Sequence, residues 1–344
     1  MLDVEEIPIL SSDDSEDKPN DALLMRETNC CVCSGSRSER IGSGLDFEYS
    51  TAAGEFHADR CVDCGLVFLN PRPDVSEFER IYPDNYHAFE FSEDQFGFVY
   101  KVRRRLEANR LLSWCEGIPA DARILDIGCG DGFHLEILRD FGLRTWQLEG
   151  VDLDERAVTI ARAKGIKVIN GDVSDERLRP SSYDLIILIQ TIEHVADPFL
   201  LLSRAFGLLR PGGRLVVVTD NTDSPDFAAF QRRYWGGYHF PRHWNLFNRS
   251  NIKKIALKAG FDVEMVRTQI SPVNWTYSIR NLLCDRRAPR WLVELFSLKS
   301  TLSLSFFTMF DMLFQLVGNG ALLNAYFRRP ESRDDNEVKH EQDQ

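Results

Sequence analysis

Long uninterrupted apolar runs are the first feature that the sequence lacks. The longest uncharged stretches are residues 300–310 and 312–327, and the second of these is broken by Gly318, Asn319 and Gly320. Neither reaches the roughly 18–20 apolar residues of a membrane-spanning helix. The beginning of the chain also has no apolar segment typical of a signal peptide. We therefore expect a cytoplasmic protein with reduced thiols, in which the eight cysteines serve as metal ligands or core residues.

A surplus of basic residues is also missing. The chain has 53 Asp and Glu against 41 Lys and Arg, which gives a formal net charge of −12. Binding to nucleic-acid phosphates needs clustered Lys and Arg, so this balance argues against nucleic acid as the main partner, although a local basic patch would still permit one. The 344 residues suffice for one full α/β domain and a smaller module.

Composition divides the chain into five parts. Residues 1–28 and 331–344 are rich in charged and polar residues without an apolar period, so we expect them to be disordered tails. Residues 29–92 hold five of the eight cysteines and are predicted to form a metal-binding module. Residues 93–120 contain apolar side chains at mostly helical spacing, which predicts a connecting helix. Residues 121–330 form the remaining, larger domain.

Short apolar strands alternate with helical stretches in this larger domain. We predict strands at residues 123–127, 146–151, 167–169, 183–189, 214–219, 261–268 and 321–327. The predicted helices include residues 133–141, 155–164, 198–209 and 249–259. Such alternation predicts an α/β fold with a mostly parallel, doubly wound sheet. An aromatic-rich helical insertion, residues 271–318, separates the last two strands.

A glycine-rich turn follows the first predicted strand. It has the sequence Asp126-Ile-Gly128-Cys129-Gly130-Asp-Gly132. Glycines allow a tight turn and a close approach of the backbone to a ligand beside a helix N-terminus, although an ordinary strand-to-helix connection can contain them too. The carboxylate of Asp126 would hydrogen-bond a ligand ammonium or orient the loop. It would repel the pyrophosphate of a dinucleotide.

Acidic residues also end the next two predicted strands. Asp152 ends the second strand, where a carboxylate accepts hydrogen bonds from ribose hydroxyls. The alternative role for Asp152 is a helix N-cap, but Asp154 is better placed as the cap and leaves Asp152 for a ligand. Asp172 ends the third strand, where an acid can receive an adenine amino group. Three acids at three successive strand ends are a more specific signal than the glycine-rich turn alone.

With these motifs, residues 100–330 resemble the class I S-adenosylmethionine (SAM)-dependent methyltransferases, in particular those with methyltransferase domains of the 23/11 kind. The resemblance implies a seven-stranded Rossmann-like sheet that ends in an antiparallel hairpin. It also implies how each matching residue contacts SAM. The methionine part would lie on Asp126, Gly128, Cys129, Gly130 and Gly132, the ribose on Asp152, and the adenine on Leu153, Asp172 and Val173. Gln190 would lie where cofactor and substrate meet.

Candidates for catalysis follow the fourth and fifth strands. Methyl transfer to a nucleophile requires positioning and sometimes removal of a proton. His243, after a stretch rich in Tyr, Trp and Gly, is our first candidate for the general base. The alternative is that His243 packs with Trp244 and Phe247 and caps a turn. Glu193 and His194 resemble a Glu-His pair of many relatives, where it is structural or faces the substrate.

A magnesium ion is not expected at this site. In one subgroup of the family, which methylates small RNAs and quinone precursors, a Glu-x-x-Glu-His sequence binds a divalent metal. Here Gln190 stands at the position of the first glutamate. Losing one carboxylate weakens a site for a hard cation, so we predict no catalytic magnesium.

Two Cys-x-x-Cys pairs mark the N-terminal module. Cys30 and Cys33 form the first pair and Cys61 and Cys64 the second, with 27 residues between them. Two such pairs predict a structural, tetrahedral Zn²⁺ site. The alternatives are a redox pair or buried thiols, but a redox pair would normally start a helix in a βαβ unit. The module resembles the N-terminal zinc module of some sugar and small-molecule methyltransferases.

The insertion 271–318 leaves its own role open. It would form a helical lid or a dimer interface, or an amphipathic surface that meets a membrane or an apolar substrate. Its arginines, Arg280, Arg286, Arg287 and Arg290, would suit anionic headgroups at the inner membrane face, or a diphosphate. The predicted function is O- or C-methylation of a small-molecule, sugar or lipid-linked acceptor. The alternatives are an RNA methyltransferase with a zinc recognition module and a SAM-binding scaffold without turnover.

Overall fold

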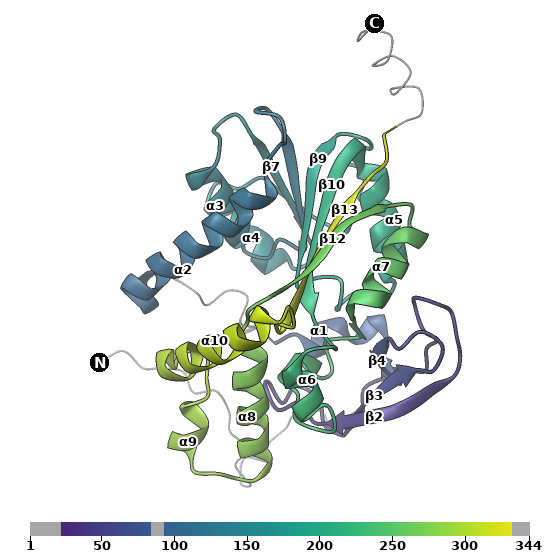
Figure 1. Ribbon diagram of the computed structural model, residues 1–344, viewed down its shortest axis with the longest axis vertical. Helices are drawn as coiled ribbons and strands as arrows, with labels where there is room; N and C mark the ends of the chain where they lie inside the picture. The colour runs from purple at the N-terminus through teal and green to yellow at the C-terminus, as the bar shows by residue number, and fades with distance from the viewer. Residues whose placement is uncertain (1–21, 84–92, 332–344) are drawn as a thin grey trace, which may run out of the picture.

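A seven-stranded sheet forms the centre of the larger domain in the computed structural model, which describes residues 22–83 and 93–331 (Figure 1). Its strand order is β12-β13-β10-β9-β6-β7-β8. The strands are β6 (Arg123–Ile127), β7 (Gln147–Asp152), β8 (Val168–Asn170), β9 (Tyr183–Ile189), β10 (Leu209–Asp220), β12 (Asp262–Gln269) and β13 (Leu322–Arg328). β13 runs antiparallel to both of its neighbours, and the other neighbouring pairs are parallel. The predicted doubly wound sheet with its terminal antiparallel hairpin is confirmed.

Helices cover both faces of this sheet because its central strands are apolar on both sides. Along β6, Ile124 packs with α2 (Glu93–Trp114) and α3 (Phe133–Phe141), whereas Leu125 packs with α5 (Pro198–Leu208) and α7 (Arg249–Lys258). α4 (Glu155–Ala163) lies against β7 and β8. The predicted caps are present: Asp154 accepts the backbone N–H of Arg156, and Asn248 caps α7.

The N-terminal module is built on a second sheet with the order β11-β4-β3-β2. β2 (Ser38–Gly44), β3 (Phe56–Cys61) and β4 (Val67–Leu69) come from the module itself. β11 (Asn245–Leu246) comes from within the predicted larger domain and pairs antiparallel with β4. One apolar cluster therefore contains Phe56, Val67 and Leu69 of the module together with Trp235 and Trp244. The two parts of the chain share a core.

The module begins before residue 29, where a disordered tail was expected. Within that tail, β1 (Met25–Arg26) pairs with β5 (Arg72–Pro73). The rest of the predicted tails, residues 1–21 and 332–344, lies outside the described residues. A short 3-10 helix, η1 (Val75–Glu77), and α1 (Phe78–Ile81) follow β5 and end the described part of the module.

The insertion between β12 and β13 is helical, as predicted. It contains α8 (Val273–Asp285), α9 (Arg290–Glu294) and α10 (Thr301–Leu316). Buried Asp311 of α10 accepts hydrogen bonds from the backbone N–H groups of Ser271 and Ala321 and from the indole of Trp275, which fastens the insertion to the domain. Among the described residues, the helices all fall short of the length and apolarity needed to cross a membrane.

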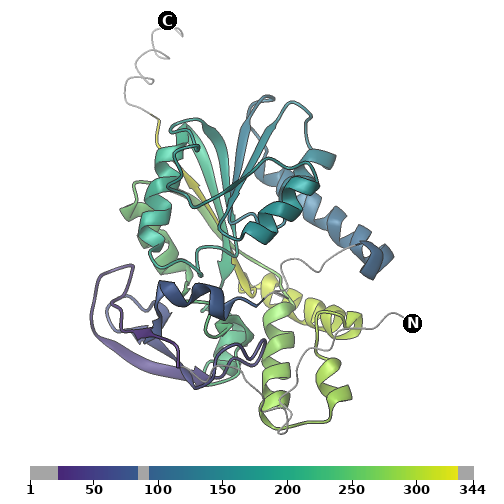
Figure 2. The same ribbon diagram turned by 180° about the vertical axis from the view of Figure 1, so that it is seen from behind.

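Two further short elements connect β10 to β11. α6 (Pro225–Phe230) is followed by η3 (Gly236–Tyr238). Figures 1 and 2 show the N-terminal module and the helices α8–α10 beyond the same end of the large sheet, toward which the arrowhead of β9 points. This arrangement places both around the carboxyl ends of the parallel strands, where ligands bind in sheets of this kind.

Candidate functional site

The glycine-rich turn lies at the carboxyl end of β6 and leads into α3. Gly128, Gly130 and Gly132 all have positive φ angles, of 74°, 52° and 77°. A Cβ atom on Gly128 would lie 2.6 Å from the side chain of Thr191, so packing excludes a larger residue there. A Cβ on Gly130 would meet no atom within 4 Å. The backbone at Gly130 thus faces open space, in which a ligand can approach it.

Asp126 lies beneath this turn with its carboxylate buried. Neither carboxylate oxygen has a hydrogen-bond partner in the described part of the chain, and the nearest imidazole nitrogen, Nδ1 of His134, is 3.8 Å from Oδ2. Burial, followed by the nearby charge of Asp152, raises the pKa of Asp126 well above its usual value. A cation placed here would restore the ionised form. The expected SAM carries positive charge on its sulfonium and ammonium groups, so this unpaired carboxyl fits it.

Asp152 connects the second strand to the turn. Its Oδ2 accepts the N–H of Gly130 at 2.8 Å, and its Oδ1 accepts the N–H of Asp154 at 2.9 Å. The next residue, Leu153, is 64% exposed and offers an apolar surface beside the carboxylate. Asp172 is exposed at the end of β8, where its carboxylate accepts the N–H of Ser174. The structure therefore brings the three predicted acids to one edge of the sheet.

Two predicted contact residues turn their side chains away from this edge. Cys129 is buried against Leu135, Val158 and their neighbours, and Val173 packs on the core under α5. Their backbones remain part of the two turns. Gln190 follows β9 with a φ angle of 51°, and its buried Oε1 has no hydrogen-bond partner among the described residues. This unpaired amide oxygen also fits a ligand at the predicted meeting point of cofactor and substrate.

Three histidines gather beyond the ends of β9 and β10. The ring centroids of His194 and His243 are 4.5 Å apart, and those of His239 and His243 are 4.9 Å apart. His194 and His239 are separated by 6.3 Å. We call these three residues the histidine cluster. The cluster contains both histidines predicted to be catalytic and adds His239 to them.

His243 has the geometry of a proton acceptor. Its Nδ1 lies 2.8 Å from the carbonyl oxygen of Gly237, which can only accept, so Nδ1 carries the proton and Nε2 keeps a lone pair. Oδ2 of Asp220 lies 3.3 Å from the same Nδ1. Burial, followed by the neighbouring imidazoles of His194 and His239, holds the pKa of His243 well below 6.5. The ring therefore stays neutral at physiological pH.

Glu193 and His194 are held in place from different directions. Glu193 is 0% exposed and accepts a hydrogen bond from Thr219, while burial and the nearby Asp220 raise its pKa. Nδ1 of His194 lies 2.7 Å from the hydroxyl of Tyr82, and burial lowers its pKa to about 3. Ligand atoms of Glu193, His194 and His243 all lie within 4.8 Å of one another. Two imidazoles and one carboxylate are not the oxygen-rich set that magnesium prefers, so we assign no step to that ion.

Sequence reasoning missed two residues that contact the cluster. Asp220 ends β10, and its Oδ1 accepts a hydrogen bond of 2.7 Å from Asn274. The signal that identified Asp126 and Asp152, an acid at the end of a strand, would have found it. Glu48 of the N-terminal module pairs with Nδ1 of His239 across 191 residues of sequence. No sequence pattern connects these two residues.

The four cysteines of the N-terminal module form one cluster. The sulfur atoms of Cys30 and Cys64 are 3.3 Å apart, and those of Cys33 and Cys61 are 3.4 Å apart. All four lie within 4.8 Å of one another. A tetrahedral site with Zn–S bonds of about 2.3 Å places its sulfurs about 3.8 Å apart, so this geometry fits a single zinc ion.

We expect purified protein to contain about one zinc ion per chain and Cys61→Ser to lose it, because three thiolates no longer close a structural site. Elemental analysis of both proteins measures this. Cys31→Ser is the matched control, since Cys31 lies outside the cluster and its substitution should leave the zinc content unchanged. Full zinc in Cys61→Ser, or none in the native protein, would remove the assignment.

Comparison with known proteins gives a consistent family. The family described as “Methyltransferase domain” matches residues 98–266. A ubiquinone biosynthesis O-methyltransferase from Cereibacter sphaeroides is 30% identical over 169 residues, covering 46% of this chain and 67% of the relative. A “Probable S-adenosylmethionine-dependent methyltransferase” from Mycolicibacterium smegmatis is 30% identical over 166 residues, or 47% of this chain. The chain spans only 59% of the length of this second relative.

Solved structures of the same kind are more distant. A SAM-dependent methyltransferase from Archaeoglobus fulgidus has a TM-score of 0.44 and 19% identity, over 70% of this chain and 99% of the other. The geranyl diphosphate C-methyltransferase of Streptomyces coelicolor has a TM-score of 0.47 and 15% identity, over 70% and 85% of the two chains. At this distance neither structure indicates what the chain acts on.

Proposed function

Because this chain belongs to the class I SAM-dependent methyltransferases, we propose that it transfers the methyl group of SAM to a small-molecule, sugar or lipid-linked acceptor, by O- or C-methylation. The observation that carries the proposal is one edge of the sheet that combines two features. An unpaired buried carboxyl, Asp126, lies under an open glycine turn, and a neutral histidine, His243, lies beyond the neighbouring strands. The ubiquinone O-methyltransferases among the relatives support an acceptor of low molecular weight.

The chemistry asks for little from the protein beyond position and one proton transfer. SAM supplies an activated methyl group, whose bond to sulfur breaks as the acceptor attacks in line from the opposite side. Nε2 of His243 takes the proton of the attacking hydroxyl or enol, and Asp220 next to Nδ1 stabilises the imidazolium that forms. The unpaired oxygen of Gln190 lies between the two halves of the site and can orient the acceptor.

SAM binding tests the cofactor site directly. Gly130→Asp fills the open space with a side chain, and Asp152→Ala removes the ribose carboxylate, so each change should weaken binding at least tenfold, or about 1.4 kcal/mol. Isothermal calorimetry measures both. Asp154→Ala is the matched control because it removes a neighbouring carboxylate that only caps α4. Wild-type affinity in both test variants would contradict the site.

The acceptor can be identified without guessing its structure. We expect deletion of the protein from its source strain to remove one methylated compound or to accumulate its unmethylated precursor. Untargeted comparison of metabolites and lipids between the deletion strain and its parent would reveal that pair. An RNA fraction that loses methylation instead would favour the RNA alternative.

The outer face of α10 supports a lipid-linked or membrane-associated acceptor. Large apolar side chains recur at intervals of three or four along this helix and are 61–80% exposed: Leu302, Phe306, Met309, Leu313 and Leu316. Trp291 of α9 is 70% exposed, and Arg286 and Arg287 are exposed just before it. Apolar residues beside cations suit an anionic bilayer surface. We propose that α9 and α10 contact such a surface.

Sedimentation with phosphatidylglycerol vesicles measures this contact. We expect Phe306→Glu/Leu313→Glu to lose most of the binding, whereas Leu257→Glu should keep it, because Leu257 is an equally exposed leucine on α7. Size-exclusion chromatography of the same proteins checks the other use of an apolar face. A wild-type dimer that the double substitution separates, without vesicle binding, would replace the membrane by a second copy of the chain.

A further inference from the structure

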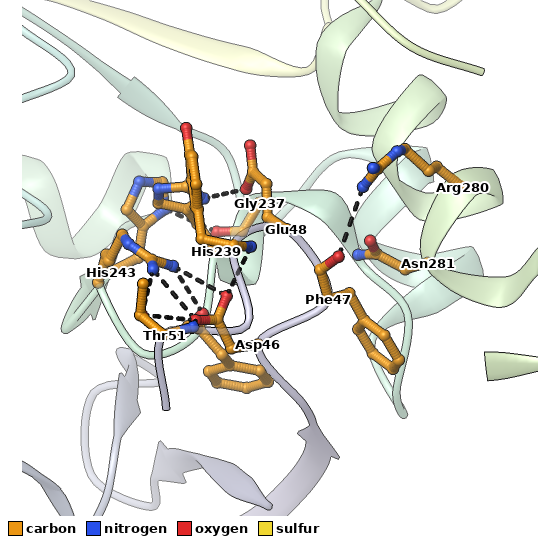
Figure 3. A network of polar contacts seen from close by, with 12 residues as sticks. Asp46, Phe47, Glu48, Thr51, Gly237, His239, His243, Arg280 and Asn281 are labelled. Carbon is orange, nitrogen blue, oxygen red and sulfur yellow. Dashed lines mark hydrogen bonds and ion pairs between the residues drawn. The ribbon is translucent and has the colours of Figure 1, made fainter. Parts of the chain in front are cut away.

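The loop of residues 45–51 in the N-terminal module reaches into the candidate active site (Figure 3). It connects β2 to β3, and both oxygens of Asp46 accept hydrogen bonds of 3.1 Å from the guanidinium of Arg242. The side chains of this pair are 0% exposed. Arg242 also donates to the hydroxyl of Thr51 at 2.7 Å. Because Arg242 directly precedes His243, the loop is fastened at the backbone of the proposed base.

Glu48 of this loop holds the third histidine of the cluster. Its carboxylate contacts Nδ1 of His239, and the two side chains are 13% and 10% exposed. The side chain of Tyr277 in α8 hydrogen-bonds the same carboxylate. Figure 3 shows Glu48 and His239 side by side, between the loop and the segment that contains Gly237 and His243.

The module therefore contacts two of the three histidines. Tyr82, just after α1, lies at 2.7 Å from Nδ1 of His194, and Glu48 contacts Nδ1 of His239. Both contacts are made to the ring nitrogen nearer the backbone, which leaves Nε2 as the atom that can exchange a proton with an acceptor. A module that served only as a separate binding domain would have no reason to contact these atoms.

The contact with Glu48 differs from the others in its charge. His194 and His243 are buried, and neighbouring imidazoles add to the cost of protonating them. A carboxylate beside one imidazole offsets part of that cost, because it attracts the proton that the cluster takes up. The other charged or titratable groups around Glu48 are Tyr49, Arg242, Tyr277 and Arg280.

We propose that Glu48 is a positioning residue of the methyl transfer, supplied by the N-terminal module. It keeps the proton of His239 on Nδ1, and its negative charge stabilises the proton that the histidine cluster takes from the acceptor. The acceptor oxygen or carbon loses this proton as it forms its bond to the methyl group, and the proton later passes to water. This inference rests on the proposed methyltransferase function.

Two substitutions separate the charge of Glu48 from its hydrogen bond. Glu48→Gln keeps an oxygen that can accept from Nδ1 but removes the charge, whereas Glu48→Leu removes both. Glu55→Gln is the matched control, because Glu55 is an exposed carboxylate of the same module that pairs with Arg233. NMR of protein labelled with ¹⁵N at histidine distinguishes the two imidazole tautomers. We expect the Nδ1–H form of His239 in the wild type and Glu48→Gln, and the Nε2–H form in Glu48→Leu.

The functional measurement uses the methylated compound that the deletion strain loses. Strains that carry Glu48→Gln should make it at roughly a tenth of the parental rate or less, Glu48→Asp should restore part of the loss, and Glu55→Gln should match the parent. SAM affinity and thermal stability should be unchanged in Glu48→Gln. Parental production in both Glu48→Gln and Glu48→Leu would overturn the inference. A deletion strain without any altered compound would instead overturn the proposed function.

Discussion

His243→Ala should slow methyl transfer by about 10²–10⁴-fold while SAM affinity stays nearly unchanged. The imidazole is already neutral, its Nδ1 is fixed by the carbonyl of Gly237, and Asp220 is placed to stabilise its charged form. Alanine removes the proton acceptor without touching the glycine turn. Single-turnover kinetics with the identified acceptor, together with calorimetry for SAM, would measure the two effects separately.

The pH dependence of the wild type provides an independent check on the same base. A base must be unprotonated to act, and burial together with the neighbouring histidines lowers the pKa of His243. Activity should therefore persist below pH 6.5, and its acidic limb should lie on the acid side of an ordinary histidine. His239→Ala and His194→Ala belong in the same series. Full activity in His243→Ala with loss in His194→Ala would transfer the role, and full activity in all three would mean that positioning alone suffices.

Asp46→Ala should destabilise the protein by about 3–5 kcal/mol, because it leaves the guanidinium of Arg242 buried without its counter-charge. Urea unfolding followed by tryptophan fluorescence measures the change. Glu294→Ala is the matched control: it also breaks a carboxylate–arginine pair, but both side chains are more than half exposed, and the expected loss is below about 1 kcal/mol. Replacing both members, as in Asp46→Leu/Arg242→Met, should restore much of the lost stability. Equal stability of Asp46→Ala and wild type would show that water reaches Arg242.

The sequence predicted the large sheet closely because its strands carry a local signal. Residues 183–189 were predicted as a strand and form β9, since an apolar run of this length is buried on both faces. The prediction for β10 was too short at its start, because Leu209 pairs with β9 ahead of a register shift that precedes Arg214. Apolar periodicity cannot indicate a strand that continues through proline and glycine.

What the sequence did not reveal depends on contacts between distant segments. The candidate cofactor residues follow strands in order, so parallel pairing alone brings Asp126, Asp152 and Asp172 to one edge. Glu48 and Tyr82 reach the histidine cluster only because the module packs on the end of the sheet. That packing is decided by side chains far apart in the chain, such as Asp46 with Arg242. Single-sequence patterns contain no record of such pairings.

The strand β11 also sets an order of events during synthesis. The small sheet is complete only when Leu246 has paired with Val67, so a nascent chain carries β4 with an open edge while the intervening residues are translated. At bacterial synthesis rates this takes on the order of ten to thirty seconds. During that time the apolar partners of Phe56 and Leu69, Trp235 and Trp244 among them, are still inside the ribosome or not yet made. The cysteine turns can bind their metal early, but the module becomes a finished structure only together with the catalytic segment, so chaperones would meet both as one folding unit.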